Sequence, residues 1–353
     1  MEFHPEPSYN MLLTAGKNGM CALFSTGTMG GTGAGAAPAL LYHFKAHSKW
    51  VSAARFVPTA ARAGSMPVIT TADDGMVKVW DMARQGKKSA QLLLASQEPH
   101  NRGIFALDVA GDAILTGSKD KTVCLSRLDA GCGGLKAESR FELHSNVVKS
   151  VEWCPGSNGH VFASGAQDRS VCVKDARCGR PCHPEVEILD AHSGGVHTVA
   201  WAPLSGTGIG IGTGIGGGCP QFLLASAGMD PVVKVWDMRF PLKPLHVTGT
   251  GEGDGAKGGE EVGREPLHCF QGHARTGARL KSILPVRWLS PSVLVTPGEA
   301  SDQLSLYCAA SGRTLSRGEL GDEPIGTCPG GPGGMVAVAT RRSGVFFLLP
   351  TYK

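Results

Sequence analysis

Short apolar runs separated by turn residues follow one another along the whole chain, and one arrangement of them recurs. The two fullest copies are Val68–Asp81 (VITTADDGMVKVWD) and Leu223–Asp237 (LLASAGMDPVVKVWD). Each consists of an apolar run, small or hydroxyl residues, a turn that contains Asp, a second apolar run and a final Trp-Asp pair. Such short runs between turn signals predict β-strands, and their recurrence predicts a repeat architecture.

Seven copies of this unit can be aligned, and units two to five keep one internal spacing. In these four units an Asp lies six residues, and a Ser or Thr ten residues, before the Trp position, and a His precedes the first strand. The four sets are His47, Thr70, Asp74 and Trp80; His100, Thr116, Asp120 and Ser126; His144, Ser164, Asp168 and Lys174; and His192, Ser226, Asp230 and Trp236. The other units are weaker: Met11–Ser25 has Phe24 in the Trp position, Val293–Tyr307, preceded by His273, has Tyr307 there, and Met335–Leu349 keeps only the strand pattern.

The constant spacing predicts what these polar residues do. Side chains alternate between the two faces of a strand, so the Ser/Thr and the Trp fall on defined faces of neighbouring strands, with the Asp in the tight turn between them. A His, a hydroxyl, an Asp and an indole can then form one buried hydrogen-bonded chain, which stabilises a sheet only if every member is satisfied. We therefore interpret the histidines as structural residues, and not as catalytic or metal-binding ones.

This pattern resembles the WD-repeat family over nearly the whole chain. The resemblance implies an all-β fold: a single seven-bladed propeller of four-stranded antiparallel blades over residues 1–353, around a central channel. Six blades, with one unit as a linker, is the alternative. The chain starts within an innermost strand (Glu2–Pro5) and stops at a third strand (Val345–Leu349). One outer strand of the last blade then has no donor, so either the N-terminus is short or that blade is three-stranded.

Composition limits the partner and the compartment. The 353 residues carry a net charge of +4, with 34 Lys and Arg spread along the chain, which favours a solvated surface over a nucleic-acid groove. The 11 cysteines form no disulfide framework, and the sequence has neither a signal-peptide pattern nor an apolar run of membrane-spanning length. We expect protein partners, no direct binding of nucleic acid, no membrane insertion, and a reducing compartment such as the cytoplasm or the nucleus.

Three Gly-rich segments interrupt the repeats, at residues 26–37, 204–220 and 248–266. They hold too few apolar residues to pack and are predicted to be mobile insertions. A phosphate-binding loop is not supported, because no Gly-Lys-Ser/Thr follows the glycines and no helix is predicted after them.

The sequence contains no Gly-x-Ser-x-Gly or His-Glu-x-x-His motif. The one dense group of sulfur and imidazole ligands is Cys178, Cys182 and His183, which Cys172 could complete. Because Cys172 falls inside a strand and a second close pair is absent, zinc is only an alternative here, beside a reactive pair of loop thiols. We predict that the protein is not an enzyme and has no catalytic residue, cofactor or metal site.

Two arginines each follow the last Asp of a repeat by two residues, in Trp236-Asp237-Met238-Arg239 and Lys174-Asp175-Ala176-Arg177. Neighbouring blades would present both guanidinium groups on one rim, where Arg suits bidentate recognition of a partner's carboxylate or carbonyl groups. The tandem Asp-x-Arg resembles substrate receptors of cullin-4 ubiquitin ligases, in which the Arg-bearing blades dock on the damaged-DNA-binding adaptor subunit. Three features depart from that family: Lys174 replaces Trp, Ala83 replaces Arg in unit two, and no helical segment precedes the first blade. An Arg that only braces its own blade through the Asp is the alternative.

We therefore predict a non-catalytic scaffold for protein–protein interactions, with Arg177 and Arg239 as candidate partner-binding residues. Its specific form would be a substrate receptor that docks on the adaptor of a cullin-4 ligase. The alternative is a scaffold subunit of a trafficking, peroxisomal-import, chromatin or RNA-processing complex, because the fold alone does not choose among these. An enzyme is the third class, but the sequence shows neither an activated nucleophile nor an acid–base pair that would support it.

Overall fold

The computed structural model describes residues 1–6, 9–26, 39–57, 66–82, 90–95, 99–129, 134–204, 222–238, 265–271, 285–297, 303–322, 324–331, 335–340 and 344–348. Every regular element in these ranges is a β-strand. The predicted Gly-rich insertions at residues 26–37, 204–220 and 248–266 lie almost wholly outside the described residues. Within the described part, no helix is long and apolar enough to cross a membrane.

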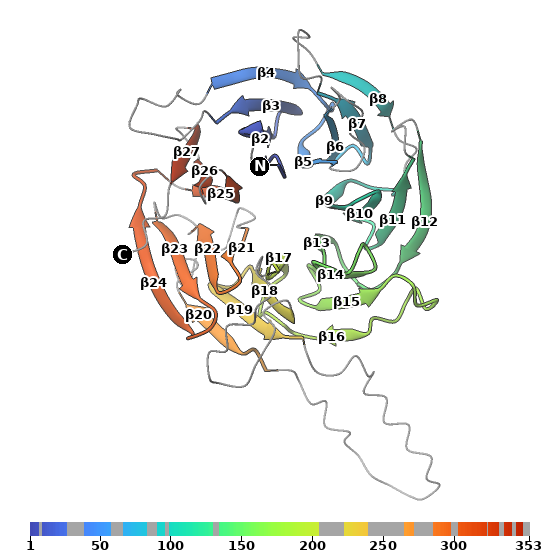
Figure 1. The fold of residues 1–353 in the computed structure, drawn as a ribbon. Helices are drawn as coiled ribbons and strands as arrows, with labels where there is room; N and C mark the ends of the chain where they lie inside the picture. Colours follow the sequence, from blue (N-terminus) through green and yellow to red (C-terminus); the bar gives the residue numbers. More distant parts are fainter. Residues whose placement is uncertain are drawn as a thin grey trace, which may run out of the picture.

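The strands form seven antiparallel sheets around a common centre, with the first strand of each sheet innermost (Figure 1). We number these sheets blades 1 to 7 in chain order. Blades 1 and 2 consist of β1 (Glu2–Phe3), β2 (Met11–Ala15), β3 (Met20–Ser25) and β4 (Ala39–Lys45), and of β5 (Val51–Phe56), β6 (Pro67–Ala72), β7 (Val77–Asp81) and β8 (Gln91–Ala95). Blades 3 and 4 consist of β9 (Ile104–Ala110), β10 (Ala113–Ser118), β11 (Val123–Leu128) and β12 (Leu135–Phe141), and of β13 (Val148–Trp153), β14 (Val161–Ala166), β15 (Val171–Asp175) and β16 (Val186–Ile188).

The remaining blades continue the same order. Blades 5 and 6 consist of β17 (Val196–Trp201), β18 (Leu223–Gly228), β19 (Val232–Asp237) and β20 (His268–Gln271), and of β21 (Arg287–Ser290), β22 (Val293–Pro297), β23 (Gln303–Cys308) and β24 (Arg313–Glu319). Blade 7 consists of β25 (Pro324–Gly331), β26 (Met335–Thr340) and β27 (Gly344–Leu348).

An all-β propeller of four-stranded antiparallel blades is confirmed for six of the sheets. The last sheet has three strands among the described residues, which is one of the two alternatives that the sequence left open for it. The reason is topological. The N-terminal strand β1 pairs with β2 in blade 1, through Glu2 opposite Leu13 and Phe3 opposite Leu12, so it does not supply an outer strand to blade 7.

The hydrophobic core lies between neighbouring blades. One cluster joins Leu115 of blade 3 to Val148 and Phe162 of blade 4, and the next joins Val173 of blade 4 to Trp236 of blade 5. Each sheet is therefore covered on both faces. A sheet covered on both faces needs apolar or small residues at successive positions, without alternation, and all six residues of β6 and of β10 are indeed buried.

Glycines on second strands set how closely two blades approach. A Cβ atom added at Gly165 on β14 would lie 2.7 Å from Cγ1 of Val196 and 3.0 Å from Cγ1 of Val199, both on β17 of blade 5. Gly117 on β10 meets Val148 of blade 4 in the same way, at 2.7 Å. The two blades can therefore approach this closely only because glycine has no side chain at these points.

We expect Gly165→Ala to lower the free energy of unfolding by about 1–3 kcal/mol, because the buried, β-branched Val196 and Val199 can move away only by disturbing blade 5. Denaturant unfolding of the purified protein measures this change. Gly318→Ala on the exposed strand β24 is the matched control, since no atom lies within 4 Å of its added Cβ. Equal effects of the two substitutions would contradict the proposed limit on blade spacing.

Candidate functional site

Blade 5 contains the predicted network in its fullest form. Nδ1 of His192 lies 2.7 Å from Oδ1 of Asp230, and Nε2 lies 2.7 Å from Oγ of Ser226. The indole Nε1–H of Trp236 donates to the same Oγ at 2.8 Å. A neutral imidazole satisfies all three bonds, because its Nδ1–H donates to the carboxylate and its Nε2 accepts from the serine hydroxyl.

Blade 2 repeats this geometry. His47 Nδ1 lies 2.9 Å from Asp74 Oδ2, His47 Nε2 lies 2.8 Å from Thr70 Oγ1, and Trp80 Nε1 donates to Thr70 Oγ1 at 2.9 Å. Burial lowers the pKa of His47 and outweighs the opposing effect of Asp74. The ring is therefore neutral at physiological pH, as the donor and acceptor roles require.

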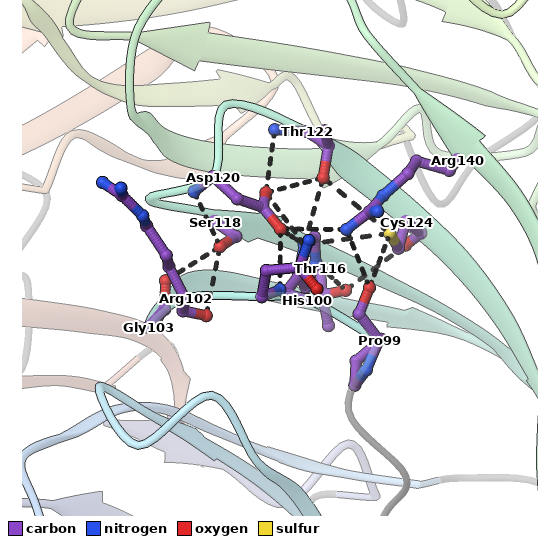
Figure 2. Close-up of polar contacts among 11 residues, drawn as sticks. Pro99, His100, Arg102, Gly103, Thr116, Ser118, Asp120, Thr122, Cys124 and Arg140 are labelled. Carbon is purple, nitrogen blue, oxygen red and sulfur yellow. Dashed lines mark hydrogen bonds and ion pairs between the residues drawn. The ribbon is translucent and has the colours of Figure 1, made fainter.

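Blade 3 lacks the indole, and Figure 2 shows the polar contacts of its histidine, His100. His100 Nε2 lies 2.9 Å from Thr116 Oγ1, whose hydroxyl is free to donate to the backbone oxygen of Cys124 at 3.4 Å. Burial of the ring is outweighed by its hydrogen bonds to Asp120 and Cys124, and the pKa of His100 rises to about 9. Both ring nitrogens then donate, and the hydrogen bonds from His100 and Thr122 hold the pKa of Asp120 below its ordinary value against the effect of burial.

Blade 4 has Lys174 where blades 2 and 5 have tryptophan. The Lys174 side chain is fully buried, and its Nζ pairs with Oε1 of Glu185 at 2.9 Å. Oε2 of Glu185 accepts from the backbone N–H of Asp175 at 2.6 Å. Ser164 is left with one network partner, Nε2 of His144 at 2.8 Å. Lys174 and Glu185 thus connect the end of β15 to the end of the loop that follows it.

The structure brings the His, the Ser or Thr and the Asp of each set together within their own blade, and the residue at the Trp position joins them only in blades 2 and 5. Each of the four imidazoles has the Asp on its Nδ1 side and the hydroxyl on its Nε2 side; the Nδ1–Asp distances in blades 3 and 4 are 3.1 Å and 3.2 Å. All four rings are buried. These contacts fit a structural role, because both nitrogens of each ring already have partners.

A second group of residues, most of them charged, lies on the innermost strands, and the sequence reasoning missed it. In every blade, one residue of the first strand lies opposite the equivalent residue of the second strand. These first-strand residues are Glu2, Arg55, Asp108, Glu152, Ala200, Arg287 and Cys328. We call these seven residues the inner ring. The sequence pattern that could have revealed the inner ring is a charged residue directly before the aromatic residue of a first strand, as in Arg55-Phe56, Glu152-Trp153 and Arg287-Trp288.

The carboxylates of the inner ring link consecutive blades. Glu2 accepts from the backbone N–H of Phe56 at 2.7 Å, Asp108 from that of Trp153 at 2.8 Å, and Glu152 from that of Trp201 at 3.3 Å. Nε of Arg55 lies 3.7 Å from both Glu2 Oε1 and Asp108 Oδ1. These contacts connect blades 1 to 5 in order.

Burial raises the pKa of each inner-ring carboxyl group. The pKa of Glu2 rises to about 7 and that of Glu152 to about 8, and the pKa of Asp108 rises as well. Arg55 and Arg287 oppose this effect by favouring the charged forms. The positive charge of the two guanidinium groups therefore does not fully compensate the loss of water around three carboxyl groups.

Arg177, one of the two predicted partner-binding residues, is braced by its own blade. Its Nε and Nη2 lie 2.9 Å and 2.6 Å from the two carboxylate oxygens of Asp175, and 64% of its side chain is exposed. These bonds raise the pKa of Arg177 and lower that of Asp175. Arg239 and His273 lie outside the described residues, so the predicted placement of both arginines on one rim stays a prediction.

The cysteines singled out in the sequence do not gather. Cys172 is buried in β15, whereas Cys178 and Cys182 are exposed. Over the described ranges, no group of three or more His, Cys, Asp or Glu side chains is arranged to hold a metal ion. The zinc alternative therefore has no support from the geometry of these residues.

The propeller and its repeated networks of His, Ser/Thr and Asp agree with the resemblance to WD-repeat proteins. The family described as "WD domain, G-beta repeat" matches residues 38–81 and 184–237. Each match spans the last strand of one blade and the first three strands of the next. The chain is therefore similar to the WD-repeat family in these two segments.

Among curated proteins, the chain is similar to transport and chromatin subunits. It is 26% identical over 191 residues to "Protein transport protein sec13" of Emericella nidulans, which covers 52% of this chain and 60% of that protein. It is 33% identical over 113 residues to the sec13 protein of Aspergillus clavatus, covering 32% and 37%. It is 26% identical over 202 residues to "Histone acetyltransferase type B subunit 2" of Eremothecium gossypii, covering 57% and 41%. The chain thus spans between 37% and 60% of the length of these relatives.

Ser226 bonds an indole and the equivalent Ser164 does not, so we expect their loss to cost different amounts of stability. We expect Ser226→Ala to lower the free energy of unfolding by about 2–4 kcal/mol, because it leaves both His192 Nε2 and Trp236 Nε1 buried without a partner. Ser164→Ala should cost about half as much, since it leaves only His144 Nε2 unpaired. Both serines are fully buried, so the two substitutions remove the same volume. Equal losses in denaturant unfolding would show that the indole bond contributes nothing.

Stability should fall as the pH rises from 6.5 to 9. The contribution of His100, whose pKa is raised to about 9, is fully present below pH 6.5 and is lost as the pH approaches 9. Glu2 and Glu152 act in the same direction, because the folded protein keeps protons up to about pH 7 and 8 that the unfolded chain releases near pH 4.5. His47 and His197, whose pKa values are lowered, have the opposite effect, most of which lies below pH 6.5 and which fades above it as the unfolded imidazoles lose their protons. Denaturation midpoints at pH 6.5, 7.5 and 8.5 measure the slope.

The variant Glu152→Gln isolates one of these groups. Glutamine keeps an oxygen that can accept from Trp201 but does not ionise, so we expect the loss between pH 6.5 and 8 to shrink by about 1–2 kcal/mol. Glu187→Gln, at an exposed position on β16, is the control and should leave the slope unchanged. An unchanged slope in Glu152→Gln would mean that this carboxyl group titrates as it does in water.

Proposed function

We propose that the protein is a non-catalytic scaffold that holds other proteins together in a transport or chromatin complex. The similarity to sec13 over 52% of the chain is the observation that carries this proposal, and the similarity to a histone acetyltransferase subunit supports it. Of the complexes predicted as alternatives, trafficking and chromatin are the two that the names of these relatives favour. Location in the cytoplasm or the nucleus remains a prediction that follows from the same proposal.

The geometry supports binding more than catalysis. In the networks of blades 2 to 5, each histidine is buried and has both ring nitrogens engaged. A general base needs a nitrogen within reach of a substrate proton, and these rings have none to spare. Blades that are tied internally by such networks, and to one another by the inner ring, form a rigid support for loops that contact partners.

Docking on a cullin-4 adaptor is the second candidate function. The observation in its favour is the exposed guanidinium of Arg177 at the start of the loop after β15. Its two bonds to Asp175 also fit the simpler role of bracing. In a propeller that docks through this residue, a partner's carboxylate would have to compete with Asp175.

One purification distinguishes the two candidates. We expect the tagged full chain, purified from the organism that makes it, to co-elute in fixed stoichiometry with subunits of one transport or chromatin complex. The double variant Arg177→Ala/Arg239→Ala should retain those subunits, and mass spectrometry with size-exclusion chromatography measures both. A cullin-4 adaptor that is present with the unaltered chain and lost with the double variant would establish the receptor function instead. Elution as a single chain would contradict both.

A further inference from the structure

A hollow of about 450 Å³ opens between blades 3 and 4, where β9 turns into β10 and β13 leads into β14. Its volume falls within the range of about 300–1,000 Å³ that is usual for ligand sites. The wall consists of the turn after Asp108, up to Asp112, and of the loop from Trp153 to Gly159. The loop that carries Arg177 adjoins it, because the backbone N–H of Ala176 donates to the oxygen of His160 at 2.7 Å.

The backbone holds this hollow in shape. Four of its residues, Gly111, Gly156, Asn158 and Gly159, have positive φ angles of 65°, 78°, 52° and 72°. The loop is closed by hydrogen bonds from the N–H of Cys154 to the oxygen of Val161 at 2.8 Å and from the N–H of Ser157 to the oxygen of Cys154 at 3.1 Å. A Cβ added at Gly159 would lie 3.0 Å from that of Ala113. The site is therefore formed before any ligand arrives, which reduces the entropy lost on binding.

The charge of the hollow is negative. Its lining contains Asp108 and Asp112 and no Lys, Arg or His. Each of these aspartates pairs with an arginine whose guanidinium group also lies close to a second carboxylate. Arg55 lies 3.7 Å from Asp108 and from Glu2, and Arg127 lies 2.9 Å from Asp112 and 3.1 Å from Glu138. Arg287 also acts on Asp108, so four carboxyl groups, Glu2, Asp108, Asp112 and Glu138, face three guanidinium groups, in a chain whose overall charge is +4.

The apolar part of the wall suits a long side chain. Val109, Trp153 and Pro155 line the hollow beside the two aspartates. Nε1 of Trp153 is buried and has no hydrogen-bond acceptor in the described part of the chain. Asp112 is accessible to an incoming group, since 58% of its side chain is exposed. A methylene stem with a cationic end matches this combination of an apolar wall and unbalanced carboxylates.

We propose that this hollow binds an arginine side chain from an extended segment of a partner protein. Its guanidinium pairs with Asp112 and faces Asp108, while its methylene groups contact Val109 and Trp153. Arginine fits better than lysine, because its planar fork matches a carboxylate in two places and is more weakly hydrated. The partner being a protein rests on the proposed scaffold function, but the binding of the side chain can be tested without it.

Two small probes of the same shape test the charge requirement. Nα-acetyl-arginine N-methylamide and its citrulline analogue are titrated into the ¹⁵N-labelled full chain, and the indole N–H signals of its six tryptophans are followed by NMR. Trp153→Phe assigns the signal of Trp153. We expect the arginine probe to shift this signal in a saturable way and the citrulline probe to leave it unchanged. Equal shifts with both probes, or none with arginine, would overturn the proposal.

A matched pair of variants tests the position of the site. Asp112→Asn should weaken binding of the arginine probe about two- to fivefold, the contribution of one ion pair with a solvent-exposed carboxylate. Arg127 keeps its second partner, Glu138, in this variant. Asp190→Asn, which alters another exposed, ion-paired aspartate, of blade 4, should leave the affinity unchanged. Equal affinities for both variants would place the probe elsewhere. A positive result with no stoichiometric complex in the purification would retain the site and reject the scaffold function.

Discussion

The rest of the structure depends on one buried hydroxyl group in the second strand of a blade. In blades 2 and 5 the hydroxyl of Thr70 or Ser226 donates its proton to an imidazole, and its oxygen accepts from an indole N–H. The imidazole comes from the connection that enters the blade and also bonds the aspartate of the turn. One oxygen therefore fixes the connection, two strands and the turn relative to one another. The net gain of each bond is about 1 kcal/mol, but the cost of leaving any member unpaired in the interior is what makes the arrangement unique.

Blades 3 and 4 show how this network responds when the indole is replaced. With Ser126 in the Trp position, the hydroxyl of Thr116 donates to a backbone oxygen instead, and a protonated His100 can then donate to it. With Lys174 in that position, the interior of blade 4 gains a cation that Glu185 must balance. The same pairs of imidazole, hydroxyl and carboxylate persist in both blades. One substitution therefore changes the protonation or charge of a blade and leaves its strand order intact.

The sequence predicted contacts within a blade better than contacts between blades. The network residues could be found because they lie within one repeat, where a constant spacing reflects fixed strand positions. The link from Glu2 to the N–H of Phe56 joins residues 54 positions apart and depends on how the ring closes, which no spacing encodes. For the same reason the sequence left a three-stranded last sheet as one of two alternatives, since the choice depends on the blade that β1 joins. Arg177 lies two residues after the end of β15, and its pairing with Asp175 could not be separated from docking by sequence alone.

The inner ring and the acidic hollow share Asp108, and this residue couples the seam between blades 3 and 4 to whatever the hollow binds. Burial raises the pKa of Asp108, and the carboxylate form is the better acceptor for the N–H of Trp153 that it contacts at 2.8 Å. A cation bound nearby stabilises that charged form and so strengthens the contact between the two blades. By linkage, conditions that favour ionised Asp108 must favour the cation to the same extent. The link that keeps the blades in order thus also sets how strongly this part of the propeller holds a basic partner.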